Sequence, residues 1–494
     1  MNAIGASILV VLVLAVLFSP RRWALLAMMA GVLYLTQAQQ IIVLGFNFYA
    51  MRFLELAGFV RVMARREFSF RQLNGIDNAL ILLYAFSTVV FLIRSPDGKA
   101  NAIGGALDAF LCYFTFRGLM DGVESFRWFL RAFFILLAPY TLLILIESVT
   151  GHNHFAVLGG VTGGSAWMRH GLPRCFGSFR EPDTLGMFAA SFIPLYIGLA
   201  CIANKRKLAV FCLCLCLLLV WAANSGGAAS GAAVGLVCWG LWRFRTVMWK
   251  VRRLIVAMIV LLTIGMKAPI WYLFARASAI TGGDGWHRSY LIQMFYEHFG
   301  QWWLAGMSPK DTSGWMGYDL ATVGGADITN QYLGFGINAG LGAVVLFVLL
   351  LKRAYGGLGK VLAAVRSSSS GTSEAEFLLW GLGVMLVVHI VNWFGIAYFD
   401  QIYVIWFMQL AAIATLSQAY LARPEAAVVE EAVIEPEMEE PQPTAVLGQI
   451  KCAQYPSIVA ADVVLISKQK AEICNREMIL NCSSALISDD GNDL

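Results

Sequence analysis

Apolar segments long enough to cross a bilayer recur throughout the first 420 residues and leave this chain few possible folds. A membrane-spanning helix needs about 20 predominantly apolar residues. Segments of this kind lie at 3–19, 23–40, 41–63, 78–93, 100–116, 128–148, 183–203, 208–223, 227–243, 254–273, 331–351, 375–394 and 398–420. Only 14% of the residues are charged, whereas soluble domains carry about 25%. We therefore predict an all-α polytopic integral membrane protein with about 12 to 13 transmembrane helices and two long periplasmic loops.

Clusters of Lys and Arg set the expected orientation, because they follow every second predicted span. They lie at 21–22, 61–71, 117–131, 205–207, 243–253 and 352–366. Loops rich in Lys and Arg stay on the cytoplasmic side of a membrane. The long loops at 149–182 and 276–330 are then both expected on the periplasmic face of a bacterial inner membrane.

The end of the chain differs in charge from the rest. Residues 421–494 hold 5 Lys/Arg and 13 Asp/Glu, a net charge of −8, whereas the 420 residues before them hold 31 and 18, a net charge of +13. The segment is also punctuated by Pro and poor in aromatic residues, which is typical of disorder. We predict a transmembrane domain at 1–420 and a disordered cytoplasmic tail at 421–494. The basic charge of the membrane domain suits a phosphate-bearing substrate.

The polar loop at 276–330 is the first candidate site, since an ordered loop of this length is usually functional. Residues 284–295 have helical spacing and carry His287 and Arg288 beside Trp and Tyr side chains. The polar residues that stand where the chain re-enters the membrane are Asp327, Thr329 and Asn330. We interpret this cluster as a candidate active site; the alternative is an aromatic belt at the lipid headgroups with solvated charges.

The loop at 149–182 is the second candidate site, because it holds three arginines that periplasmic loops usually avoid. They are Arg169, Arg174 and Arg180. A guanidinium is the preferred bidentate partner of phosphate, so the three predict an anion site. Glu181 and Asp183 follow at the start of the next predicted helix, where Asp183 suits the helix dipole as a capping residue.

Charged residues inside the predicted spans form a smaller group of candidates. Arg52 and Glu55 are three residues apart and can pair on one helix face, whereas Asp108 has no local partner. Ionisable residues at membrane depth often face a cavity and mark functional sites. No His, Cys or carboxylate spacing predicts a metal site, and no nucleotide loop is found. We expect no metal, no cofactor and no nucleic-acid partner.

Three stretches resemble the O-antigen ligase and Wzy-type O-antigen polymerase superfamily of bacterial envelope proteins. Residues 174–192, RCFGSFREPDTLGMFAASF, are similar to its R-x-x-G-[ST]-F-x-x-P-x-x-L-[GA] motif before a central span. Residues 286–309, WHRSYLIQMFYEHFGQWWLAGMSP, are similar to its G-R-x-x-[LY]-[WI] helix and the turn that follows. Residues 329–347, TNQYLGFGINAGLGAVVLF, are similar to its H-N-x-[YF]-L motif. The resemblance covers about 130–420 and rests on the order and spacing of the motifs.

This resemblance implies a metal-independent membrane glycosyltransferase of the polymerase or ligase type. Such proteins move glycan from an undecaprenyl-diphosphate donor to a glycan or lipid A core acceptor at the periplasmic face, in O-antigen or exopolysaccharide biosynthesis. The matching motifs imply that Arg174 and Arg288 bind the diphosphate, with Arg169 and Arg180 in the same cationic group. Membrane lipids and other polysaccharide-export components are the further partners that we expect.

The resemblance breaks down at the residue that is expected to act as the general base. Family ligases have a His where this chain has Thr329, and a Thr hydroxyl cannot act as a base at neutral pH without activation. Asp327, Glu181 or His287 would then take the proton, and Asn330 belongs to the same matched motif. This departure favours a polymerase or a divergent exopolysaccharide protein over a ligase of the usual kind.

Two other classes of protein stay open. A transporter, including the bicarbonate-uptake proteins that share this family's sequence pattern, is expected to show inverted repeats and broken helices at the midplane. A non-catalytic component of an envelope polysaccharide machine is expected to lack clustered Arg in its loops. The polar residues of this chain gather at one face, which favours the glycosyltransferase over both.

Overall fold

Backbone groups inside a bilayer must pair within their own segment, so long apolar runs fold as α-helices. The computed structural model describes residues 1–43, 46–95, 99–164, 167–169, 171–202, 206–281, 284–320, 324–367 and 373–421. Apart from its first residue, the predicted tail at 421–494 lies outside the described residues. Everything described belongs to one compact unit, Met1–Glu431.

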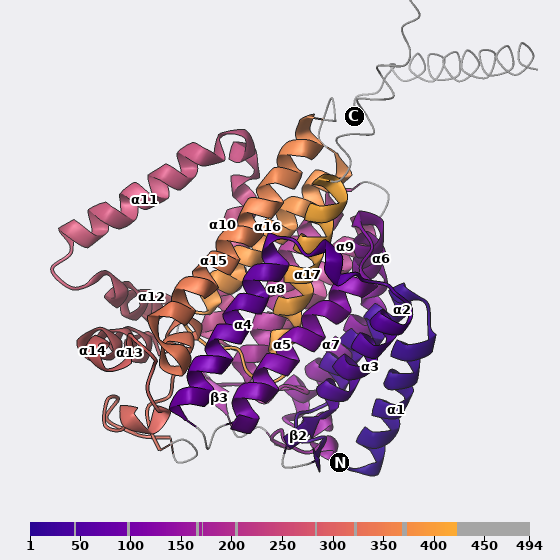
Figure 1. The fold of residues 1–494 in the computed structure, drawn as a ribbon, viewed down its shortest axis with the longest axis horizontal. Helices are drawn as coiled ribbons and strands as arrows, with labels where there is room; N and C mark the ends of the chain where they lie inside the picture. The colour runs from indigo at the N-terminus through magenta and orange to yellow at the C-terminus, as the bar shows by residue number, and fades with distance from the viewer. Residues whose placement is uncertain are drawn as a thin grey trace, which may run out of the picture. The chain divides into compact units, whose positions relative to one another are not determined.

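Helices make up most of this unit (Figure 1). Those before residue 151 are α1 (Ala3–Phe18), α2 (Arg21–Tyr34), α3 (Ala50–Ala64), η1 (Phe70–Gln72), α4 (Gly75–Arg94), α5 (Lys99–Leu119), α6 (Val123–Ala132) and α7 (Phe134–Thr150). Those up to the second long loop are η3 (His154–Leu158), α8 (Pro182–Ala200), α9 (Arg206–Ala223), α10 (Gly226–Gly240), η5 (Leu241–Val247) and α11 (Met248–Gly265). The rest are η6 (Ile270–Tyr272), α12 (Leu273–Thr281), α13 (Gly285–Glu297), α14 (Phe299–Trp302), η7 (Pro309–Thr312), α15 (Gln331–Ser367), α16 (Glu374–Asn392) and α17 (Ile402–Leu421).

The predicted class, an all-α polytopic membrane protein, is confirmed. Each predicted span overlaps a helix. In the described part of the chain, seven helical segments are long and apolar enough to cross a membrane, or eight if one bent pair counts as a span. Three of the remaining helices, α1, α2 and α3, have only 14 to 16 residues. That is shorter than the roughly 20 residues of a full span, so the count of about 12 to 13 spans stays a prediction.

The predicted span at 41–63 is wrong in its first part. Strands β1 (Gln40–Val43) and β2 (Phe46–Tyr49) form an antiparallel hairpin there, and α3 begins only at Ala50. Ile, Val, Phe and Tyr dominate this stretch, and a short run of them suits a strand as well as an apolar helix. A second hairpin, β3 (Met168–Arg169) with β4 (Leu172–Pro173), lies in the loop at 149–182.

Two helices with almost continuously buried residues, α8 and α17, lie inside the bundle (Figure 1). α8 packs against α9, α10 and α16, and α17 packs against α5 and α15. A helix that is hydrophobic all round is expected to be surrounded by other helices or by lipid. Because α8 is central, the loop before it must bring its last residues to the middle of one end of the bundle.

α11 stands apart from the other helices (Figure 1), and none of its residues is buried. Its sequence, MWKVRRLIVAMIVLLTIG, is apolar after the first turns. Apolar side chains on every face suit a helix surrounded by lipid. After α11 the chain bends by 101° into the segment Ile270–Ser278, which begins the second long loop.

α15 is broken near its start, where Gly340 has a φ of +78°. A Cβ at this position would lie 2.6 Å from the carbonyl oxygen of Leu304, so the break requires glycine. The backbone N–H of Leu341 donates to the carbonyl oxygen of Trp303 at 2.7 Å. These contacts fasten the turn after α14 to the start of α15.

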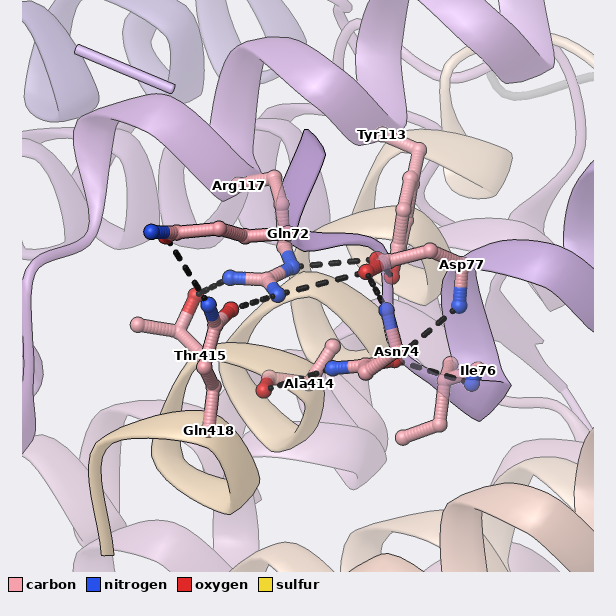
Figure 2. Close-up of polar contacts among 9 residues, drawn as sticks. All are labelled: Gln72, Asn74, Ile76, Asp77, Tyr113, Arg117, Ala414, Thr415 and Gln418. Carbon is pink, nitrogen blue, oxygen red and sulfur yellow. Dashed lines mark hydrogen bonds and ion pairs between the residues drawn. The ribbon is translucent and has the colours of Figure 1, made fainter. Parts of the chain in front are cut away.

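Figure 2 shows a buried ion pair that joins α4, α5 and α17. The guanidinium of Arg117 donates to the carboxylate of Asp77 at 3.1 and 3.3 Å, and the hydroxyl of Tyr113 donates to it at 2.5 Å. Arg117 also donates to the side chains of Thr415 at 3.0 Å and Gln418 at 2.6 Å. Both charges are buried but satisfied by several hydrogen bonds, which a buried ion pair requires.

Candidate functional site

Glu147 of α7 fixes the last part of the loop at 149–182. Its carboxylate accepts hydrogen bonds from the backbone N–H of Phe176 at 2.7 Å and of Gly177 at 3.0 Å. Gly177 has a φ of +57°, and a Cβ there would lie 2.4 Å from the hydroxyl of Tyr140. The turn therefore requires glycine, and it determines where the charged residues before α8 lie.

Arg174 lies at the start of α8, against Asp183 and Trp167. Its Nη2 donates to the carboxylate of Asp183 in the first turn of the helix, and its Cζ lies 5.6 Å from the centre of the Trp167 ring. Its Nε is buried and has no hydrogen-bond partner in the described part of the chain. Burial lowers the pKa of Arg174; the carboxylate of Asp183 opposes this shift, and the charge of Arg169 adds to it.

A cavity of about 70 Å³ lies beside Arg288 of α13. Residues from α8, α10, α12 and α16 line it, among them Met187, Gly227, Phe274, Ser278, Asn392 and Gly395. Two glycines make room for the guanidinium, because a Cβ at Gly395 would lie 3.0 Å from Cζ and one at Gly227 3.5 Å from Nη2. The guanidinium thus forms part of a mostly apolar wall.

The carboxylate of Asp183 acts on arginines from both long loops. It pairs with Arg174, and it opposes the lowering of the Arg288 pKa that burial causes. Arg169 lowers the pKa of both arginines. Three of the predicted residues, Arg169, Arg174 and Arg288, therefore belong to one electrostatic cluster. Arg174 and Arg288 both interact with the carboxylate of Asp183, and the charge of Arg169 acts on both arginines. Three guanidinium groups and one carboxylate leave a net positive charge, which suits a phosphate-type anion.

Arg180 and Glu181 lie close to a carboxylate that the sequence analysis missed, Asp400. This residue stands between α16 and α17 with a φ of +50°, and its Oδ2 is buried without a hydrogen-bond partner among the residues described. Burial raises the pKa of Asp400 to about 6, and the charge of Arg180 opposes the shift. Burial also raises the pKa of Glu181; Asp183 adds to this shift, and Arg174 opposes it.

His287 lies beside Thr329. Thr329 stands at the position where the family that the three motifs resemble has a His. The Nδ1 of His287 is 3.4 Å from the hydroxyl of Thr329, and its ring stacks on Tyr318 with centroids 6.0 Å apart. His287 is only 4% exposed, and its Nε2 has no hydrogen-bond partner in the described segments. Burial raises the pKa of Asp327, and the charge of His287 opposes that shift. His287, Asp327 and Thr329 thus form a second cluster.

Asn330 has a structural place at the start of α15. Its Oδ1 accepts hydrogen bonds from the backbone N–H of Tyr332 at 3.0 Å and of Leu333 at 3.1 Å, as a helix N-cap does. Its Nδ2 lies 3.4 Å from the carbonyl oxygen of Phe394. The carboxamide therefore positions α15 against the loop after α16, and a catalytic part for Asn330 stays a prediction.

The local pair of Arg52 and Glu55 that their spacing predicts is wrong. Arg52 pairs with Asp108 of α5, donating from Nε at 2.6 Å and from Nη2 at 2.8 Å. Glu55 accepts instead from the hydroxyl of Tyr403 at 2.9 Å. Helix packing explains the difference, since α3 lies against α5 and brings Asp108 within reach of Arg52.

Metal-ligating side chains do not gather in the described ranges, where no group of three or more His, Cys, Asp or Glu could hold a metal ion. The rings of His152 and His154 lie 5.2 Å apart, and His170 is outside the described residues. The cysteines described are all free, including buried Cys175.

Comparison with protein-family models finds no model that matches this chain, and comparison with curated proteins finds no match either. A functional assignment therefore rests on the residues and geometry of the two clusters.

Proposed function

We propose that this protein is a membrane glycosyltransferase of the polymerase or ligase type, which takes glycan from a lipid-diphosphate donor. The observation that carries the proposal is the electrostatic cluster of Arg169, Arg174, Arg288 and Asp183, in which Arg288 lines a mostly apolar cavity. A diphosphate leaving group gains negative charge as its bond to the sugar breaks, and positioned guanidinium groups stabilise that charge. Undecaprenyl diphosphate is the donor that the resemblance of the three motifs implies.

The distribution of Lys and Arg supports a periplasmic site in a bacterial inner membrane. Basic clusters follow every second predicted span, and both long loops lie between spans on the other side. A periplasmic glycan acceptor, either a growing polysaccharide or a lipid A core, has free access to such a site. The same reasoning gives about 12 to 13 spans and a cytoplasmic C-terminal tail.

The proposed reaction is a displacement at the anomeric carbon of the donor sugar. A hydroxyl oxygen of the acceptor forms the new glycosidic bond to this carbon. The bond from the carbon to the diphosphate oxygen breaks, and its electron pair leaves with the lipid diphosphate. Arg174 and Arg288 hold the negative charge that develops there.

His287 is the base that best fits this reaction. Its Nε2 is free to accept the proton of the acceptor hydroxyl, while Nδ1 lies against the hydroxyl of Thr329. An imidazole nitrogen is far more basic than a Thr hydroxyl, so it accepts a proton where the hydroxyl cannot. The carboxylate of Asp327 stabilises the imidazolium that forms. Glu181 and Asp400, beside Arg180, are the alternative proton acceptors.

One observation favours a transporter as the second candidate. Transporters commonly contain discontinuous helices around their substrate site, and here α15 is broken at Gly340 while the segments on either side of 266–269 meet at 101°. A bicarbonate carrier would use the same guanidinium groups to bind its anion. It would leave the glycans of the cell unchanged.

The test is the glycan profile of host cells that lack this protein. We expect loss of long-chain glycan, with lipid-linked single repeats accumulating for a polymerase or uncapped lipid A core for a ligase. An unchanged glycan profile together with lost bicarbonate uptake would contradict the proposal and support the transporter. If deletion abolishes the glycan and a variant with both Arg174→Ala and Arg288→Ala fully restores it, the protein would be a non-catalytic component instead.

A further inference from the structure

Glu55 of α3 is a completely buried carboxyl group that the proposed reaction does not use. Its residue is 0% exposed. One oxygen accepts the hydrogen bond from Tyr403 of α17 at 2.9 Å, whereas the other, Oε2, is buried with no hydrogen-bond partner in the described part of the chain. An ionised carboxylate at such a place requires a positive partner or several donors.

The positive charge near Glu55 belongs to Arg52, which is already paired with other groups. The guanidinium of Arg52 donates to both oxygens of Asp108, at 2.6 and 2.8 Å, and its Nη1 donates to the backbone carbonyl of Asn47. Its Cζ also lies 5.1 Å from the centre of the Tyr49 ring. Because Arg52 and Asp108 form a neutral pair, an ionised Glu55 would leave a net negative charge inside the bundle.

The groups that face Glu55 from the other helices do not compensate that charge. α5 contributes the carboxylate of Asp108 and the thiol of Cys112, a weak donor that lies near enough to Glu55 to interact with it, and α17 contributes the hydroxyl of Tyr403. Tyr84 of α4 interacts with Asp108 and Cys112. Apart from Arg52, which is paired, these groups are acidic or neutral, so they disfavour a second negative charge.

A metal ion is a poor alternative occupant. Hard cations take six or more oxygen ligands, whereas both oxygens of Asp108 are engaged by Arg52 and one oxygen of Glu55 is engaged by Tyr403. A proton needs only the free Oε2. A proton is therefore the ligand that can neutralise Glu55 without displacing the surrounding atoms.

We propose that Glu55 is a proton-binding site within the membrane domain, occupied at neutral pH and in exchange with water at the β1–β2 hairpin. The path runs along the Arg52–Asp108 pair, whose side chains are each 15% exposed. Arg52 continues it to the exposed backbone at Asn47 in β2. Carboxyl groups that take up protons at membrane depth are a recurrent feature of membrane proteins. This inference is independent of the proposed glycosyl transfer.

The test is infrared spectroscopy of the purified full chain in lipid, comparing the wild type with Glu55→Gln at neutral pH. Glutamine keeps an acceptor for Tyr403, so the variant is expected to fold. The wild type minus variant spectrum should contain one carbonyl band of a protonated carboxylic acid, which shifts after transfer to D₂O. A carboxylate band in its place would show an ionised Glu55 and overturn the proposal. A carboxylic-acid band that never shifts in D₂O would overturn the exchange with water.

Two further variants assign the band. Tyr403→Phe removes the hydrogen bond to Glu55 and should move the band without abolishing it. Asp77→Asn changes another fully buried carboxyl, but one that is ion-paired to Arg117, so its difference spectrum should contain a carboxylate band and no protonated one. If Tyr403→Phe left the band where it was, the band would not arise from Glu55 and the proposal would fail.

Discussion

The Nδ1 of His287 lies 3.4 Å from the hydroxyl oxygen of Thr329, although 42 residues separate them in the sequence. The resembling family has a His at the position of Thr329 itself. In this chain an imidazole reaches the same place from α13, and its charge interacts with the carboxylate of Asp327. Under the proposed function, His287 therefore replaces the base that the family motif has at the position of Thr329.

We predict that His287→Gln lowers glycan transfer by about a hundredfold or more, because general base catalysis contributes roughly 10² to 10⁴ in rate. The measurement is the rate of product formation with membrane-inserted protein at saturating donor. His298→Gln is the matched control, because the ring of His298 stacks on Trp315 with centroids 4.4 Å apart and the residue has no part in the proposed reaction. If His287→Gln kept the wild-type rate, the base would have to be Asp327, Glu181 or Asp400.

Arg174 and Arg288 should each lose about a hundredfold in rate when changed to Ala, or about 3 kcal/mol of transition-state stabilisation. Lys should restore little, because an ammonium keeps the charge but not the planar fork that binds two phosphate oxygens. Product is measured per amount of membrane-inserted protein. Arg276→Ala is the control, since Arg276 is exposed in the same loop. Near-normal product in both Lys variants would mean that the arginines bind only lipid headgroups.

Most of the helices were predictable from the sequence because their signal is local: an apolar run of sufficient length favours a helix. The hairpin at 40–49 was not, since its Ile, Val and Phe residues suit either structure. The pairing of Arg52 with Asp108 depends on how α3 packs on α5, which no local spacing contains.

The candidate site was predictable only in part. Arg174 was recognisable as a residue type unusual in its loop, and Arg288 as part of a polar cluster that also matches a family motif. Asp183, whose charge acts on both, had a sufficient local explanation as a helix-capping residue. Asp400 was absorbed into the predicted span at 398–420. The signal that could have found it is a carboxylate at the edge of an apolar segment, where charge is costly unless it has a function.

Asp400 should make the protein less stable as the pH rises. Its pKa is raised from 3.8 to about 6 in the folded state, so its stabilising contribution is complete below about pH 4 and is lost as the pH rises through about 6. Asp400→Asn removes this dependence. We expect the variant to melt at a higher temperature than the wild type at pH 7.5 and at nearly the same temperature at pH 4.

The control for this pH dependence is Asp319→Asn. Hydrogen bonds from Ser313 and Gly314 lower the pKa of this exposed carboxylate, so its contribution is lost as the pH falls, not as it rises. The Asp319→Asn variant should gain no stability at pH 7.5. The assigned burial of Asp400 would be contradicted if the wild-type melting temperature rose between pH 4 and pH 7.5 and Asp400→Asn did not change this rise.

Removing one side of the buried pair in Figure 2 should be strongly destabilising. Asp77→Ala leaves Arg117 buried without its counter-ion, and breaking a buried pair in this way costs about 3 to 5 kcal/mol. The double variant Asp77→Leu with Arg117→Met removes both charges and should recover much of that loss. Equilibrium unfolding in mixed detergent measures both. Equal destabilisation by the single and double variants would show that packing, and not charge, explains the effect.

The orientation of the protein decides whether the arginine cluster faces the compartment where the proposed acceptor lies. Because Lys and Arg clusters favour the cytoplasm, Ser313 in the second long loop should be periplasmic and Ser367 at the end of α15 cytoplasmic. Native cysteines such as exposed Cys201 and Cys214 are first replaced. Intact cells that carry a single Ser313→Cys or Ser367→Cys variant, with the outer membrane permeabilised, are then treated with a membrane-impermeant thiol reagent. Ser313→Cys should be labelled at once and Ser367→Cys only after the inner membrane is opened. The reverse pattern would put the arginine cluster in the cytoplasm, where a lipid-linked glycan awaiting transfer at the periplasmic face could not reach it, and the proposed function would have to be abandoned.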